Sequence, residues 1–214
     1  MQISVFDLDH TLLKVNSSFK FGIYLYRQNL MSLNTLLKCL MTYFRHKYLQ
    51  LPLEKLHHDV FDLFFKGKSS YKIQQQVQEF LRVSFDALVR DSVIERLQWA
   101  RKRGDYLVIS SNSPSFIVQP IAQLLQVDEW LATEYSEDEN HCLNAILFLC
   151  QGEDKANHLR ALATRLNIPL TSFTMYSDSH LDLPAMLTAG TAVGVSPNKK
   201  LTKICHQKGW EILL

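Results

Sequence analysis

The chain has 214 residues, of which 47% are hydrophobic and 21% are charged, and its formal net charge is +2. These values are typical of a globular protein with a sizeable core, and they exclude intrinsic disorder. The sequence has no uninterrupted apolar run of about eighteen residues and no dense stripe of Lys and Arg, so we expect neither a membrane-spanning helix nor nucleic-acid binding.

The charges are distributed unevenly. Residues from Lys14 to Arg90 include twelve Lys or Arg and five Asp or Glu, whereas the rest of the chain includes eleven and sixteen. This asymmetry indicates a second structural unit, whose basic surface either attracts an anionic substrate or is simply a set of solvated helix faces. The four cysteines form no C-x-x-C pair, which favours a reducing compartment, and we therefore expect a cytoplasmic protein.

The chain begins with an apolar run that ends in acidic residues. Ile3 to Phe6 is typical of a buried strand, and Asp7, Asp9 and Thr11 follow it. Because side chains alternate along a strand, Asp7 and Asp9 are expected on the same side. Two adjacent carboxylates are costly unless one is protonated or a divalent cation binds them, although a lone Asp-x-Asp is more often a solvated turn.

The next residues are expected to form helices only. Ser17 or Ser18 is placed to cap a first helix, and apolar residues at three- and four-residue intervals from Leu36 to Phe44 indicate a second. Their aromatic residues are interpreted chiefly as core, with contact to lipid as the lesser alternative.

A third helix follows the turn at Leu51 and Pro52 and ends near Gly67, and a fourth is expected before residue 88. His57 and His58 lie within the third helix. Adjacent residues diverge on a helix, so we interpret both histidines as surface residues and not as a metal cluster.

From about residue 90, helices alternate with short apolar runs. Strands are predicted at 106–109, near 130–135 and 145–150, and at 172–176, 191–195 and 210–213. This alternation predicts an α/β fold with a Rossmann-like parallel sheet, covered by helices on both faces. The predicted organisation is an α/β core of residues 1–14 and 89–214 with an inserted all-helical cap of residues 15–88.

Ligands bind at the carboxyl ends of the strands in such a sheet. Asp7 follows the first predicted strand, Ser110 and Ser111 follow the second, and Asp178 follows the strand at 172–176, while a helix after residue 152 supplies Lys155. A carboxylate nucleophile, a hydroxyl group, a cation and further carboxylates for a metal are the groups that phosphoryl transfer needs.

At these residues the chain resembles the haloacid dehalogenase superfamily of hydrolases, and most closely its phosphoserine phosphatase-like branch with a helical cap. The resemblance covers essentially the whole chain, and four motifs in order are far more specific than any single one. The motifs are matched by Asp7-Leu8-Asp9-His10-Thr11, by Ser111 with Asn112, by Lys155, and by Asp178-Ser179-His180-Leu181-Asp182.

The resemblance implies a phosphatase that works through an aspartyl-phosphate. Asp7 would attack phosphorus, and Asp9 would act as general acid and then as general base. Thr11, Ser111 and Asn112 would bind the phosphoryl group.

The resemblance also implies a Mg²⁺ cofactor held by Asp7, Asp9 (through its backbone carbonyl) and Asp178, with Asp182 orienting these ligands from behind. Lys155 would bind substrate and neutralise charge on the phosphoryl group and on Asp7.

Three positions depart from the family pattern. Ser177 stands where a glycine is usual, and Asn16 stands where phosphoserine phosphatases usually have a glutamate that recognises the amino group of the substrate. The second motif lacks the Ser-Gly-Gly of those enzymes, so Ser110 is an alternative to Ser111. The departure at Asn16 argues against phosphoserine, so the expected substrate is another small phosphorylated metabolite or a phospholipid-like molecule. A phosphotransferase with the same intermediate and a catalytically silent regulatory protein of the same fold remain alternatives.

Overall fold

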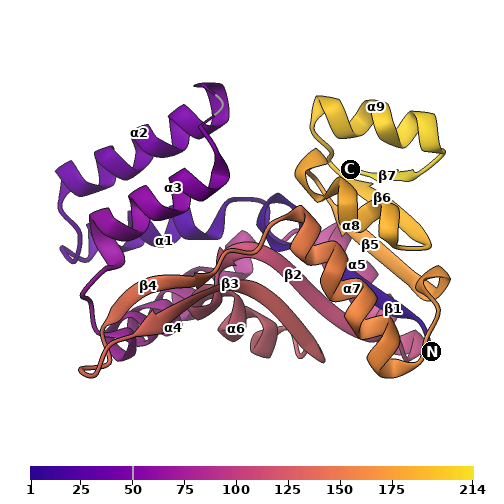
Figure 1. The fold of residues 1–214 in the computed structure, drawn as a ribbon, viewed down its shortest axis with the longest axis horizontal. Helices are drawn as coiled ribbons and strands as arrows, with labels where there is room; N and C mark the ends of the chain where they lie inside the picture. Colours follow the sequence, from indigo (N-terminus) through magenta and orange to yellow (C-terminus); the bar gives the residue numbers. More distant parts are fainter. Residues whose placement is uncertain (50) are drawn as a thin grey trace.

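A mixed β-sheet runs through the computed structural model, which describes residues 1–49 and 51–214 (Figure 1). Within these residues the sheet has seven strands in the order β4-β3-β2-β1-β5-β6-β7. All neighbouring strands are parallel except β3 and β4, which are antiparallel. The strands are β1 (Ile3–Phe6), β2 (Tyr106–Pro114), β3 (Glu129–Glu137), β4 (Leu143–Phe148), β5 (Phe173–Ser177), β6 (Thr191–Val195) and β7 (Glu211–Leu213).

Helices cover both faces of this sheet, as predicted, and short turns η1 (Leu8–Leu12), η2 (Phe61–Phe65) and η4 (His180–Asp182) connect several elements. The helices are α1 (Ser17–Arg27), α2 (Leu33–Leu49), α3 (Leu53–Val60), α4 (Ser70–Leu88), α5 (Asp91–Arg103), α6 (Ser115–Leu124), α7 (Gly152–Leu166), α8 (Leu183–Thr188) and α9 (Lys199–Lys208). Across residues 1–49 and 51–214, none of them combines the length and the apolar character that crossing a bilayer requires.

Alternation along β1 divides the core between the two faces. Ile3 and Val5 are fully buried in a cluster with residues of α7, α8 and α9. Phe6 is buried on the opposite side, in a larger cluster with residues of α5 and α6. A strand that is apolar on both sides is expected at the centre of a covered parallel sheet, and β1 occupies that place. The Rossmann-like α/β fold is thereby confirmed.

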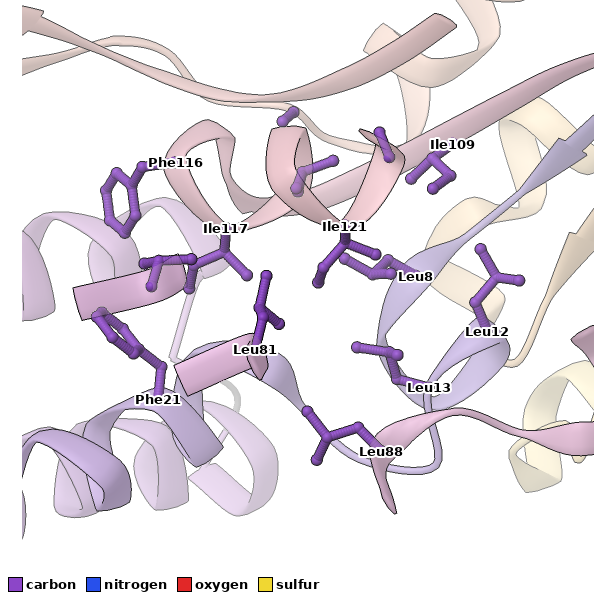
Figure 2. Close-up of a cluster of buried hydrophobic side chains, with 14 of the residues drawn as sticks. Leu8, Leu12, Leu13, Phe21, Leu81, Leu88, Ile109, Phe116, Ile117 and Ile121 are labelled. Carbon is purple, nitrogen blue, oxygen red and sulfur yellow. The ribbon is translucent and has the colours of Figure 1, made fainter. Parts of the chain in front are cut away.

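The inserted helices divide into two groups. Figure 1 shows α1, α2 and α3 together beside the β3–β4 end of the sheet, whereas α4 lies next to α6. In Figure 2, Leu81 of α4 approaches Ile117 and Ile121 of α6, and all three belong to the larger buried cluster. α4 therefore shares the core of the α/β part of the chain. The predicted boundary between cap and core at residue 88 stays a prediction.

Two local details differ from the expectations. The residue that caps α1 is Asn16, whose side chain accepts a hydrogen bond from Phe19 N at 2.8 Å, and not Ser17 or Ser18. β2 does not end at residue 109 but continues to Pro114, because Ser110 and Pro114 still pair with β3 across an irregularity in register.

Candidate active site

The central position of β1 brings three predicted motifs to one edge of the sheet. Phe6 pairs with Ile109 of β2 on one side and with Tyr176 of β5 on the other. Asp7 therefore follows β1 between β2, which continues to Pro114, and the end of β5, and its backbone N–H donates to Tyr176 O at 2.9 Å. The strand order changes direction along the chain at β1, which is where α/β sheets bind ligands.

Lys155 joins Asp7 to Asp182. The Lys155 side chain is 0% exposed, and its Nζ donates to Asp7 Oδ1 at 2.8 Å and lies 2.8 Å from Asp182 Oδ1. Ser177 Oγ donates to the other Asp182 oxygen at 2.7 Å. Asp182 thus contacts Lys155 directly, and Ser177, where the family resemblance leads us to expect glycine, takes part in the same network.

Burial dominates the electrostatics of this network. Desolvation raises the pKa of Asp7 well above its ordinary value, although the Lys155 ammonium opposes the shift. Desolvation, with a further contribution from Asp182, raises the pKa of Asp178 to about 7. Burial alone would lower the pKa of Lys155, but Asp182 and Asp7 outweigh it and raise that pKa, so Lys155 stays charged. The site therefore has an excess of buried carboxyl groups over cations.

Asp9 is held by three hydrogen-bond donors at the mouth of the site. Ser113 Oγ donates to Asp9 Oδ2 at 2.6 Å, and Ser17 N, in the first turn of α1, donates to Asp9 Oδ1 at 2.7 Å. Asn16 Nδ2 donates to Asp9 Oδ2 at 3.2 Å. The side chain is half-buried, so the carboxylate is fixed while remaining accessible from the cap.

The turn η1 carries the backbone between Asp7 and α1. His10 adopts a left-handed conformation with φ 61°. The guanidinium of Arg90 donates to His10 O at 3.0 Å and to Thr11 O at 3.2 Å, and Thr11 Oγ1 accepts from Asp178 N at 3.0 Å. Thr11 therefore ties the first motif to the fourth.

The second motif lies at the end of β2. Ser111 is 1% exposed, and its Oγ accepts a hydrogen bond from Ser113 N at 3.1 Å. Ser110 Oγ is buried and has no hydrogen-bond partner among the described residues. Asn112 is half-buried, and its carbonyl accepts from Thr133 Oγ1 at 2.7 Å. Both serines remain candidates for the phosphate-binding hydroxyl group.

The donor set fits a hard divalent cation. Asp7 is buried and Asp178 is half-buried, and desolvation, with repulsion from neighbouring carboxylates, raises both pKa values. A divalent cation would relieve this cost, and the backbone carbonyl of Asp9 would add an oxygen of the kind that Mg²⁺ prefers. Among residues 1–49 and 51–214, no three His, Cys, Asp or Glu side chains are grouped tightly enough to hold an ion by themselves. A carbonyl and solvent oxygens would have to complete the coordination.

Sequence reasoning missed Ser113 and Arg90, which support the site from outside the four motifs. Ser113 follows Ser111 by two residues, and this spacing is the one local signal that places it at the same edge. Arg90 reaches η1 from the segment before α5, and its backbone N–H also donates to Leu12 O at 2.8 Å. Nothing in the sequence indicates this long-range contact.

A model of the haloacid dehalogenase-like hydrolases matches residues 4–187, and the chain belongs to this family. A probable phosphatase of Mycobacterium tuberculosis is 29% identical over 97% of this chain and 73% of its own length. A phosphoserine phosphatase of the same organism is 27% identical over 97% and 68%. A histidinol-phosphatase of Neisseria meningitidis is 24% identical over 99% and 97%.

Solved structures share the fold at low sequence identity. A protein of unknown function from Bordetella pertussis superposes with a TM-score of 0.87 at 20% identity, covering 99% of this chain and 97% of that one. A substrate-bound phosphoserine phosphatase gives a TM-score of 0.72 at 14% identity, covering 99% and 92%. The expected membership of this hydrolase family is confirmed.

Proposed function

We propose that this chain is a Mg²⁺-dependent phosphatase that hydrolyses a phosphomonoester through an aspartyl-phosphate on Asp7. The observation that carries the proposal is the contact between Asp7 and the fully buried Lys155 at the carboxyl end of β1. In a member of this hydrolase family, that contact holds a nucleophile and a phosphate-neutralising cation side by side.

In the first half-reaction, a carboxylate oxygen of Asp7 attacks phosphorus in line. The bond between phosphorus and the ester oxygen breaks, and Asp9 gives its proton to the departing alcohol. Lys155 stabilises the negative charge on the phosphoryl oxygens, while Ser111 or Ser110 donates a hydrogen bond to them.

In the second half-reaction, Asp9 takes a proton from water as the water oxygen attacks the phosphoryl group. The bond between phosphorus and Asp7 breaks, inorganic phosphate is released and the Asp7 carboxylate is restored. A positioned acid or base of this kind contributes about a hundred- to ten-thousand-fold to the rate. The hydrogen bonds from Ser113, Ser17 N and Asn16 fix Asp9 for both steps.

The carboxylates of Asp7 and Asp178 and the backbone carbonyl of Asp9 would hold Mg²⁺. When bound, this cation supplies positive charge that favours ionised Asp7 and screens the incoming phosphate. Asp182 keeps its contacts with Lys155 and Ser177, and thereby positions the lysine. The substrate in this proposal is a small phosphorylated molecule.

The test is hydrolysis of p-nitrophenyl phosphate by the purified protein with Mg²⁺. Asp7→Asn should abolish turnover, whereas Asp86→Asn, an identical change at an exposed position on α4, should keep it. Acid-quenched wild-type enzyme should carry covalent phosphate that hydroxylamine removes, and Asp7→Asn should carry none. Equal rates for wild type and Asp7→Asn would overturn the proposal. Release of a phosphorylated product when alcohols are added would identify a phosphotransferase instead.

A further inference from the structure

A cavity of about 230 Å³ opens beside Asp9 and extends between α1, α2 and α3. Asp9, Asn112 and Ser113 lie at the end of this cavity that adjoins the active site. Most of its other lining residues belong to the inserted helices, for example Phe21 and Leu25 of α1. Whatever is attached to the phosphate in the active site therefore has a direct path into this space.

The walls are predominantly apolar. Leu36 of α2, Leu53 of α3 and Phe64 of η2 contribute aliphatic and aromatic surface. Among the described residues that line the cavity, none is Lys or Arg, and Asp9 is the sole carboxylate. A substrate with an ammonium or carboxylate group on its alcohol part would find no partner of opposite charge beyond Asp9.

Two histidines of the cavity wall do not change this picture. His57 was expected on the surface, but it lines the cavity, and only its neighbour His58 is exposed. Burial, together with His46 and His58, lowers the pKa of His57 to about 4, so it carries no charge at neutral pH. The Nδ1 of His46 hydrogen-bonds with Leu51 O at 2.6 Å, which occupies that ring nitrogen.

We propose that this cavity binds the apolar part of the substrate, so that the enzyme acts on phosphomonoesters of long-chain alcohols. The inference rests on the proposed phosphatase function and names its substrate class. Apolar burial contributes about 0.8 kcal/mol for each methylene, which corresponds to a roughly fourfold gain in kcat/KM for every carbon added to the chain.

The experiment measures kcat/KM for butyl, hexyl, octyl and decyl phosphate below their micelle concentrations, beside phosphoserine and p-nitrophenyl phosphate. The expected result is a steep rise with chain length and little turnover of phosphoserine. Hydrolysis of p-nitrophenyl phosphate without any dependence on chain length would overturn the cavity proposal alone. No hydrolysis of any ester would overturn the phosphatase proposal on which it rests.

Gly22 offers a way to fill the cavity from α1. A Cβ atom at Gly22 would meet only Leu36 Cδ1, at 3.7 Å, so a larger side chain enters without a backbone clash. Gly22→Leu should reduce the ratio of the kcat/KM values for decyl and butyl phosphate at least tenfold. Ala87→Leu, the same added bulk at an exposed position on α4, should leave the ratio unchanged. Equal ratios in the two variants would contradict the proposal.

A second observation concerns four residues of α2 that do not line the cavity. Leu33, Leu37, Met41 and Phe44 are 51%, 48%, 62% and 56% exposed and recur at intervals of three and four residues. They form one exposed apolar stripe, which we call the α2 stripe. The interpretation of the aromatic residues as core is therefore wrong for Phe44.

Charge indicates what covers the α2 stripe. Residues 15–53 contain five Lys or Arg and no Asp or Glu. Lys38 and Arg45 are exposed on α2 and lie along one border of the α2 stripe at helical spacing. An apolar stripe flanked by cations, on a segment without anions, is the pattern of a helix that lies in the surface of an anionic membrane.

We infer that the α2 stripe docks on an anionic lipid surface. The test is co-sedimentation with vesicles of phosphatidylcholine alone or of phosphatidylcholine mixed with phosphatidylglycerol. The protein should sediment with the mixed vesicles, less so at high salt, and remain largely free with phosphatidylcholine.

The double variant Met41→Glu/Phe44→Glu should lose at least tenfold in vesicle affinity. Val83→Glu/Leu147→Glu places the same charges at exposed apolar positions on α4 and β4, and it should bind as wild type does. Equal binding by both double variants would overturn the inference. A wild-type dimer that dissociates in Met41→Glu/Phe44→Glu would also overturn it, because the α2 stripe would then be covered by a second copy.

Discussion

Ser113 Oγ donates a hydrogen bond to Asp9 Oδ2 at 2.6 Å, although the two residues are 104 positions apart in the chain. Ser113 belongs to the extended end of β2, and Asp9 follows β1. The parallel pairing of these strands brings the two side chains together, so the general acid of the proposed mechanism depends on a residue outside the family motifs.

Ser113→Ala is expected to lower kcat by about ten- to a hundredfold, because a hydrogen bond to a charged group contributes about 1.5–3 kcal/mol. Ser18→Ala removes a hydroxyl group that lies 3.2 Å from Ser113 Oγ but does not hydrogen-bond to Asp9, and its effect should be much smaller. Steady-state kinetics with Mg²⁺ and p-nitrophenyl phosphate distinguish the two. Identical kcat values would show that Ser113 does not position Asp9.

Lys155→Met should destabilise the protein by about 3–5 kcal/mol, because it leaves Asp7 and Asp182 buried without their cation. Urea unfolding followed by circular dichroism measures this loss. The double variant Lys155→Met/Asp182→Asn should be less destabilised than the sum of its single changes, since one buried charge is removed with its partner. Strict additivity would argue against the ion pair.

Mg²⁺ should raise the midpoint of thermal unfolding, because it binds the folded protein and relieves repulsion between Asp7 and Asp178. At a concentration one hundred times Kd, the gain is about 2.7 kcal/mol. Asp178→Asn should lose most of this shift, whereas Asp86→Asn should retain it. A shift of the same size in Asp178→Asn would remove Asp178 from the set of ligands.

His10 tests the backbone of η1, because its side chain is exposed and its φ is 61°. His10→Val should destabilise the fold by about 1–2 kcal/mol, since a β-branched residue is strained in the left-handed region. His10→Gly should stay within about 1 kcal/mol of wild type. Chemical denaturation of both variants provides the comparison, and equal losses would contradict a backbone cause.

His57 should make the protein sensitive to acid. Its pKa is lowered to about 4 in the folded state, below the 6.5 of an unperturbed histidine, so the unfolded chain binds the proton more readily. The stabilisation is complete above pH 6.5 and is lost as the pH falls toward 4. The unfolding free energy of His57→Gln should therefore depend less on pH across this range. His206→Gln, at an exposed position on α9, should follow the wild-type curve.

The order and type of most elements could be predicted because their apolar residues alternate or recur at helical intervals. The four motifs could also be placed at one edge, because each follows a predicted strand or begins a predicted helix and the carboxyl ends of parallel strands share an edge. The structure agrees, since β1 lies between β2 and β5. Adjacent leucines on α2 could not be assigned to a side, because Leu36 lines the cavity and Leu37 is exposed. The extension of β2 depends on pairing with β3, which no local pattern encodes.

The supporting contacts of the site were unpredictable for a similar reason. Ser113 and Arg90 act through partners that are distant in the chain, and their own neighbours carry no signal of it. From the sequence, Asn16 is recognisable only as a departure from the family pattern. In the structure it both caps α1 and donates to Asp9, so one amide performs two tasks.

The first turn of α1 holds Asp9, and one to two turns further on the same helix presents Gly22 and Leu25 to the cavity. α1 therefore links Asp9, the proton donor of the proposed mechanism, to the wall of the cavity that is proposed to bind the alkyl chain of the substrate. Substitutions in α1 that change the substrate preference would therefore also disturb turnover. Among the described residues, those of α2 and α3 make no hydrogen bond to Asp9, so changes there would affect the preference alone. Relatives with other alcohols as substrates should accordingly have diverged in α2 and α3 while keeping the start of α1.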